Sequence, residues 1–255
     1  MAFMRHVPLA ALFALAAPAA VAQSGLSVAV GADYAEGKYG TPVTSRQWTI
    51  PFVAKYEAEK WSARVTVPWV RIENPSVSRD GTPLPCAGSA TAPQTVNGLG
   101  DVMLAGSVNM VESIESRVLI DITGKAKLGT ADETECLGTG ETDYYLQGDI
   151  SKGFGAFSAF GSLGWRKMGD PPGTNFKDPF YFTVGGSYRL SQTNSLGFAY
   201  DYRQKLLDTS DPLSEATLYL THRFSGLLRI QGYVVQGFSD SSPDWAVGAV
   251  LTRSF

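Results

Sequence analysis

Residues 245–255 read WAVGAVLTRSF, an alternating stretch that ends on a phenylalanine. Trp245, Val247, Leu251 and Phe255 fall on one parity, whereas small and polar side chains such as Thr252 occupy much of the other. A period of two residues is typical of a β-strand with one apolar face. Soluble chains usually end in small polar residues. This stretch therefore predicts a strand whose apolar face is kept up to its last residue.

The first 22 residues have the organisation of a secretory signal peptide. A basic start at Arg5 precedes the apolar run 9–17, and Ala-Val-Ala at 20–22 is a small-x-small cleavage site. The apolar run is too short to span a membrane as a helix. We expect residues 1–22 to be removed and residues 23–255 to form one domain, because no Pro/Ser-rich linker or block of charge divides them.

Composition narrows the function classes. The chain carries 21 basic and 24 acidic residues, a formal net charge of −3. This balance argues against a nucleic-acid reader that depends on net positive charge. No apolar stretch after residue 22 approaches the roughly 18 residues that a membrane helix needs.

Alternation recurs along the whole chain. A membrane-spanning strand needs about 9–11 residues, and most of the alternating segments are that long. Short connections such as EAEK and FSGL alternate along the chain with longer ones such as 74–97 and 130–140. An even strand number with short turns on one side is typical of an outer-membrane barrel, with both chain ends at the periplasmic side. The twelve predicted strands are 25–35, 44–57, 60–73, 98–111, 116–129, 141–152, 155–167, 177–190, 195–207, 214–224, 227–239 and 244–255.

A soluble β-sandwich or lipocalin-like barrel would show the same alternation with its apolar residues inside. Two features favour the membrane alternative: the alternating lengths of the connections, and tryptophans that all fall on the apolar parity, mostly near strand ends. We predict an all-β fold, a single antiparallel transmembrane β-barrel of about 12 strands, in a bacterial outer membrane whose lipid it contacts. The predicted membrane-anchoring aromatics are Trp48, Trp61, Trp69, Trp165, Trp245 and Phe255.

Two motifs carry a resemblance to a known family. GLGD at 98–101 opens one predicted strand, and residues 125–151 contain Leu-Gly-Thr-Gly at 137–140 followed by Asp143-Tyr144. Over about 55 residues this is similar to the outer-membrane barrel family labelled "MetA-pathway of phenol degradation", although Leu-Gly-Thr at 128–130 replaces its Pro-Thr-Gly. The resemblance implies a porin-like barrel that takes up small, aromatic molecules. The terminal Phe255 likewise resembles the signal that such barrels present to the barrel assembly machinery, with Arg253 as a departure from it.

The two cysteines predict one disulfide. Cys86 lies in the long connection 74–97 and Cys136 in 130–140, so both fall on the outer side by strand counting. In an oxidising compartment two such residues are expected to pair. With two cysteines and no nearby histidine, a zinc site is not expected, and the acidic loop residues lack the spacing of an EF-hand. We predict no cofactor.

Catalysis is not expected. His222 is the one histidine of the mature chain, and it falls on the lipid-facing parity without a nucleophile and an orienting group nearby in the sequence. The glycines lack the Gly-Lys-Ser/Thr ending of a phosphate loop. They are expected to serve as tight bends at the barrel rim.

The inward face is the candidate functional surface. A basic-biased pore would favour anionic solutes, whereas charges that pair across the lumen would close it. The predicted function is passive passage of small solutes, anionic or aromatic compounds among them. The alternative that the sequence leaves open is a non-conducting structural or surface-interaction barrel. The inward basic residues are Lys55, Arg64, Arg117, Lys125, Lys127, Arg166, Arg189, Arg203, Lys205, Arg223 and Arg229, and the acidic ones are Glu57, Asp101, Asp121, Glu141, Asp143, Asp149 and Asp201.

Overall fold

The computed structural model describes residues 4–5, 17–18, 25–85 and 94–255. Within these ranges the protein is all-β and contains no helix, hence none that could cross a membrane. Most of the predicted signal peptide lies outside the described residues. Two short strands inside it, β1 (Met4–Arg5) and β2 (Ala17–Pro18), pair with each other.

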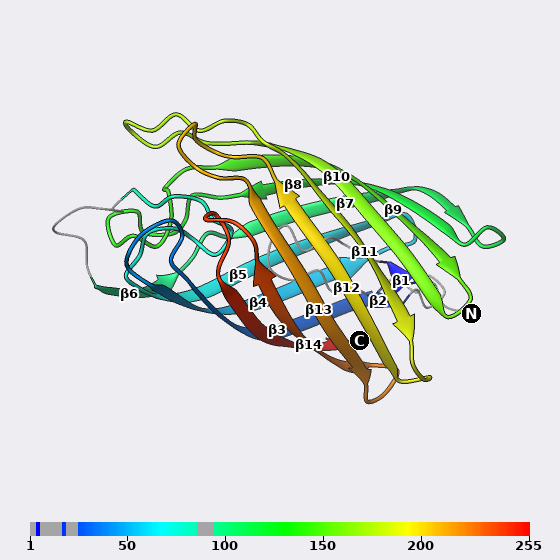
Figure 1. Ribbon diagram of the computed structural model, residues 1–255. Coiled ribbons are helices and arrows are strands. Elements are labelled where there is room, and N and C mark those ends of the chain that lie inside the picture. The colour runs from blue at the N-terminus through cyan, green and yellow to red at the C-terminus, as the bar shows by residue number, and fades with distance from the viewer. Residues whose placement is uncertain (1–3, 6–16, 19–24, 86–93) are drawn as a thin grey trace.

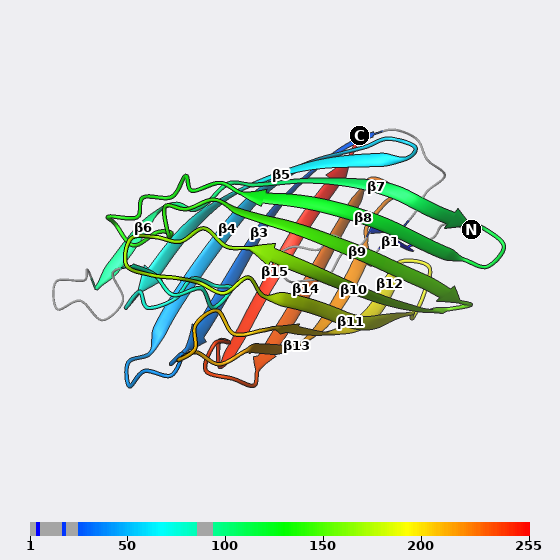
Figure 2. The same cartoon turned by 90° about the horizontal axis from the view of Figure 1, so that it is seen from above.

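The remaining strands form one antiparallel sheet (Figures 1 and 2). Apart from β6 and β7, which both pair with β5, each strand pairs with its neighbour in sequence, and β15 returns to pair with β3, so the sheet closes on itself. The strands are β3 (Gly25–Gly37), β4 (Ser45–Glu57), β5 (Trp61–Glu73), β6 (Thr95–Leu99), β7 (Met103–Ser113), β8 (Val118–Lys127), β9 (Asp143–Phe154), β10 (Phe157–Lys167), β11 (Phe180–Arg189), β12 (Asn194–Arg203), β13 (Leu213–Arg223), β14 (Leu228–Gly237) and β15 (Trp245–Ser254).

Strands β6 and β7 together occupy one position in the barrel wall. The C-terminal part of β5, Trp69–Glu73, pairs with β6. Its N-terminal part, Trp61–Thr66, pairs with β7. The break falls at residues 100–102: the amide of Gly100 still donates to the carbonyl of Pro68, next in the β5–β6 register, and pairing with β5 resumes at Met103, opposite Thr66. The thirteen strands of the sheet therefore build a closed barrel of twelve, which confirms the predicted fold class.

Burial shows which face of each strand points inward. In β9 every second residue is buried, and the buried parity carries Asp143, Gln147 and Asp149. The exposed parity of the same strand carries Leu146 and Ile150. A soluble barrel would place these two sets the other way round. Polar inside and apolar outside is the pattern of a barrel whose outer surface meets lipid.

The ends of the barrel differ as the sequence predicts. Turns such as 155–156 and 224–227 are short, whereas the connections 74–94 and 128–142 are long. Figure 1 shows the described parts of the long connections at one end of the barrel and the short turns at the other. The last strand finishes at the short-turn end, where the amide of Phe255 donates to the carbonyl of Leu26.

Candidate functional site

Residues 74–85, the described part of the connection that follows β5, enter the barrel. Residues 78–82 of this loop make a narrow turn in which the amide of Ser78 donates to Thr82 O and the amide of Gly81 donates to Ser78 O. A bridge between Val77 and Pro83 closes the base of the turn. We call residues 74–85 the lumen loop.

Glycine at position 81 is required by two features of the turn. Its φ is +70°, in the left-handed region that other residues adopt at a cost. A Cβ placed there would lie 2.1 Å from the carbonyl oxygen of Ser241, in the connection between β14 and β15. The tip of the lumen loop therefore packs directly against the backbone of the connection between β14 and β15.

Arg79 is the first anchor of the lumen loop. Its Nε lies 3.3 Å from Oδ1 of Asp33 in β3, and its Nη1 lies 3.2 Å from Oε1 of Glu215 in β13. Asp33 is fully buried and also accepts a hydrogen bond of 2.8 Å from the hydroxyl of Tyr233. Burial alone would lower the pKa of Arg79, but the two carboxylates raise it above its ordinary value. The buried guanidinium of Arg79 is thus paired with two buried carboxylates. Removal of any one of these three side chains would leave a buried charge without its full set of partners.

Asp80 is the second anchor. Its Oδ2 accepts a hydrogen bond of 2.9 Å from Nη1 of Arg166 in β10, and its carbonyl oxygen accepts one from Arg203 in β12. Burial alone would raise the pKa of Asp80, but the charges of Arg166 and Arg203 outweigh it. Hydrogen bonds from Ser78 and Thr82 act in the same direction, so the pKa lies below its ordinary value of 3.8.

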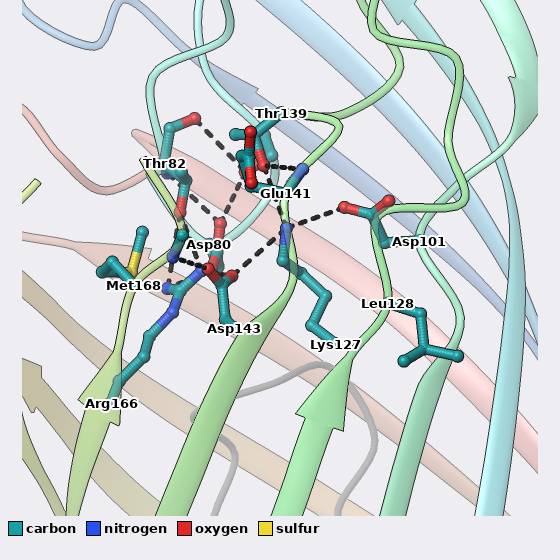
Figure 3. Close-up of polar contacts among 12 residues, drawn as sticks. Asp80, Thr82, Asp101, Lys127, Leu128, Thr139, Glu141, Asp143, Arg166 and Met168 are labelled. Carbon is teal, nitrogen blue, oxygen red and sulfur yellow. Dashed lines mark hydrogen bonds and ion pairs between the residues drawn. The ribbon is translucent and has the colours of Figure 1, made fainter. Parts of the chain in front are cut away.

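A charged network continues from this anchor along the wall (Figure 3). Arg166 Nη2 lies 2.7 Å from Asp143 Oδ2, and Lys127 Nζ lies 3.2 Å from the same oxygen. Lys127 also lies 2.9 Å from Oδ2 of Asp101. The other oxygen of Asp101 accepts from the backbone amides of Thr130 and Ala131. Asp101, at the break between β6 and β7, thereby ties the connection 128–142 to the lumen.

A second set of polar residues lies nearer the short turns. Lys125 donates to the side-chain oxygen of Gln147 at 2.7 Å, and the amide nitrogen of Gln147 donates to Asp149. Asp149 also accepts from Thr123, at 3.0 Å. Asp201 accepts from Thr183 on the neighbouring strand.

The structure distributes the predicted lumen residues over three environments. Arg117 lies in the turn between β7 and β8, with a φ of +54°, and Arg189 is exposed at the end of β11, where it donates to the carbonyl of Gly155. These two lie at the short-turn rim rather than in the lumen wall. Lys125, Asp143, Asp149, Arg166, Asp201 and Arg203 are buried inside, and Lys55, Arg64, Asp101, Asp121, Arg223 and Arg229 are half-buried.

Four of the charged residues that anchor the lumen loop were not among the predicted residues. Asp33 and Glu215 lie on the inward parity of their strands, so alternation could have identified them. Arg79 and Asp80 lie outside any alternating segment. Only the compact Ser-Arg-Asp-Gly-Thr sequence at 78–82 indicated a turn there, and nothing in it indicated that the turn points inward.

The predicted aromatics lie on the outer face. Trp48 and Trp245 flank Tyr34 near the long-loop end, with ring centroids 4.9 and 5.3 Å from it. Trp61 lies beside Tyr56 at the opposite end, with ring centroids 5.6 Å apart and the rings tilted. The outward indoles of Trp48, Trp61, Trp165 and Trp245 and the ring of Phe255 are exposed, whereas Trp69 is half-buried.

The remaining residues considered in the sequence analysis are the two cysteines and His222. Cys136 is fully buried in a cluster with Ile72, Leu84 and Val96. Its predicted partner, Cys86, lies outside the described residues, so their disulfide stays a prediction. His222 has an amide as its neighbour: its Nδ1 lies 2.7 Å from Oδ1 of Asn194. No group of three or more metal-ligating side chains occurs in the described ranges.

Solved structures of similar architecture include two porins. The KdgM porin matches 90% of this chain and 99% of its own, with a TM-score of 0.56 and 10% sequence identity. The NanC porin matches 89% of this chain and 98% of its own, with a TM-score of 0.56 and 9% identity. The fold is that of an outer-membrane porin. At this level of identity the likeness concerns the fold alone. No protein-family model and no curated protein sequence matches the chain.

Proposed function

We propose that this protein is a channel in a bacterial outer membrane through which small solutes pass passively, and that the lumen loop narrows the path. The observation that carries the proposal is the polar interior of a closed twelve-strand barrel, crossed by a loop that two anchors hold in place. A barrel of this size is wide enough to hold charged side chains and water.

The wall charges favour anionic solutes. Lys125, Arg166 and Arg203 are buried on the inward face, and Arg64 and Arg229 are half-buried there. Rings of basic side chains select anions in pores. The resemblance to the phenol-degradation family adds aromatic compounds to the expected solutes. No enzymatic step is part of the proposal.

A second candidate is a non-conducting structural or surface-interaction barrel. It is favoured by the anchoring of the lumen loop, because Arg79 and Asp80 each meet wall residues from two different strands. If this loop never leaves the lumen and no water path passes it, the interior is closed.

Single-channel recording in a planar lipid bilayer tests the function directly. The purified, oxidised protein is expected to give steady current steps, and the reversal potential in a salt gradient should show anion preference. Cation preference would contradict the assignment of the basic wall. A folded barrel that gives no current, with and without reduction of its cysteines, would favour the non-conducting alternative.

Export and assembly belong to the same proposal. Residues 1–22 would direct export, Phe255 would engage the barrel assembly machinery, and the exposed tryptophans would contact lipid headgroups. Deletion of Phe255 should lower the amount of folded barrel in the outer membrane, whereas Phe224→Ala, which changes another exposed aromatic at a short turn, should not. Mass spectrometry of unreduced peptides tests the Cys86–Cys136 bond, and two free thiols would contradict it.

A further inference from the structure

A cavity of about 170 Å³ lies between the lumen loop and the barrel wall. Residues of β4, β5, β7, β8, β9 and β10 line it. The lumen loop contributes Ser78, Arg79, Asp80, Thr82 and Leu84. Any molecule inside it would therefore touch both the wall and the loop.

One part of the cavity lining is apolar. Pro51 and Pro68 face each other across the β4–β5 ladder, and both line the cavity. Val70, Leu84 and Met103 extend this apolar surface. Surface of this kind gains free energy when an apolar group replaces water against it.

The other part of the lining is charged, with more basic than acidic side chains: the basic ones include Lys125 and Lys127, and the acidic ones are Asp80 and Asp101. Lys125 is the more deeply buried of the two lysines. Its side chain lines the cavity and is 7% exposed. Its one hydrogen bond among the described residues goes to Gln147, a neutral amide, although an ammonium group has three donors. The ring of Tyr181 lies 5.8 Å from Nζ.

Lys127, two residues further along the same strand, has the carboxylate ion pairs that Lys125 does not make. Lys127 lies within 3.2 Å of two carboxylates, Asp101 and Asp143. Among the described residues no carboxylate lies within ion-pair distance of Lys125; the Gln147 amide stands between it and Asp149. A buried charge is costly unless it is paired. The position of Lys125 beside the cavity indicates that an anion can complete its coordination.

The cavity volume limits the rest of the ligand. An apolar protein cavity of about 150 Å³ holds one benzene molecule. At about 170 Å³, this cavity suits an apolar body of one six-membered ring together with a small charged group.

We propose that this cavity is a binding site for a monocarboxylate with a single-ring apolar body, whose carboxylate accepts hydrogen bonds from Lys125 and whose ring packs against Pro51 and Pro68. This deepens the proposed function, because it names a solute class for the same lumen and rests on that function for its physiological role. Ligand binding beside the lumen loop would place the solute at the narrowest part of the path.

Isothermal titration calorimetry of the detergent-refolded protein tests the site without need of a current. The probes are benzoate, benzyl alcohol, which has the ring without the charge, and acetate, which has the charge without the ring. Benzoate should bind once per barrel, and each of the other two should bind at least about tenfold more weakly, as the loss of a charged hydrogen bond or of ring burial requires.

Variants of Lys125 test whether its ammonium group binds the carboxylate of the ligand. Lys125→Gln should weaken benzoate at least about tenfold and leave benzyl alcohol unchanged. Lys125→Arg should retain benzoate binding, and Lys60→Gln, in the exposed turn before β5, serves as the matched control. Val70→Phe fills the cavity from its apolar side and should abolish binding of benzoate while the barrel still shows its folded mobility on unheated gels.

The outcomes separate the site from the channel. Benzoate binding that needs Lys125 supports the site even if no current flows, in which case the channel function fails alone. Current without benzoate binding overturns the site and leaves the channel. Equal binding of benzoate to wild type and Lys125→Gln, or equal affinity for benzyl alcohol and benzoate, overturns the proposed ligand class.

Discussion

Arg79 and Glu215 form an ion pair inside the barrel, with Nη1 of the arginine 3.2 Å from Oε1 of the glutamate. Arg79 belongs to the loop that follows β5, and β13 is reached from β5 through β4, β3, β15 and β14. The pair therefore joins two nearly opposite sides of a twelve-strand barrel. Together with the contacts of Asp80 to Arg166 and Arg203, it holds the lumen loop across the interior.

Arg79→Gln should release the lumen loop. The change removes ion pairs to Asp33 and Glu215, both of which are almost wholly buried. Breaking a buried pair costs about 3–5 kcal/mol because it leaves charge unpaired. We expect a loss of that order in the free energy of unfolding in urea, or a smaller loss accompanied by larger current steps if the loop swings out.

Arg46→Gln is the matched control for that variant. Arg46 pairs with Glu36 and Glu73 at the exposed end of β4, and its side chain is 46% exposed. Exposed pairs contribute about 0–1 kcal/mol. Equal losses of stability in the two variants, with unchanged current in both, would contradict the anchoring role of Arg79.

Gly81→Ala should displace the tip of the lumen loop. Its added methyl group would meet the carbonyl of Ser241, on a backbone whose φ is +70°. Gly173→Ala provides the control, because Gly173 has a φ of +81° and no atom within 4 Å of an added Cβ. Both variants carry the backbone cost of about 1–2 kcal/mol. Only Gly81→Ala should also increase protease cleavage within residues 74–85.

The strands of this barrel could be predicted because their signal is local. Period-two alternation identifies a strand and its two faces without knowledge of its partners, so all twelve wall positions were found. The predicted strand 98–111 is interrupted at residues 100–102, where Asp101 leaves the ladder to accept from the amides of Thr130 and Ala131. Those partners lie about 30 residues away in sequence, and alternation carries no information about them.

The lumen loop could not be predicted for the same reason. Arg79 meets Asp33 over a separation of 46 residues and Glu215 over 136. Which charges pair across a lumen depends on the closure of the whole barrel. A loop residue also has no parity, so the sequence left the direction of residues 74–85 open.

Asp80 makes the position of the lumen loop resistant to mild acid. Its pKa in the folded barrel is lowered from the ordinary 3.8, against the effect of burial, by Arg166 and Arg203. A lowered pKa contributes stability that is present above about pH 3.8 and is lost as pH falls through the folded pKa, further down. The current attributable to loop release should therefore stay constant from pH 7 to about pH 4.

Asp80→Asn checks this pH dependence. The variant removes the charge at all pH values, so its current should already be raised at pH 7 and should change less on acidification. Conductance steps recorded in the same bilayer at pH 7, 5 and 3 compare the two proteins. A rise in wild-type current between pH 7 and pH 5 would contradict the contribution assigned to Asp80.

Leu218→Arg tests the outward face. Leu218 is 51% exposed at the middle of β13 and pairs with Phe198 and Val234 on the neighbouring strands, which are also exposed. An arginine on the lipid face costs about 2–4 kcal/mol at the bilayer midplane and about 0–1 near its edges. Leu227→Arg, at the exposed turn before β14, should therefore cost far less than Leu218→Arg when the refolding equilibrium is measured in lipid vesicles. If both changes cost the same small amount, the band around Leu218 does not contact the membrane interior, and the assignment of an apolar outer face to lipid is wrong.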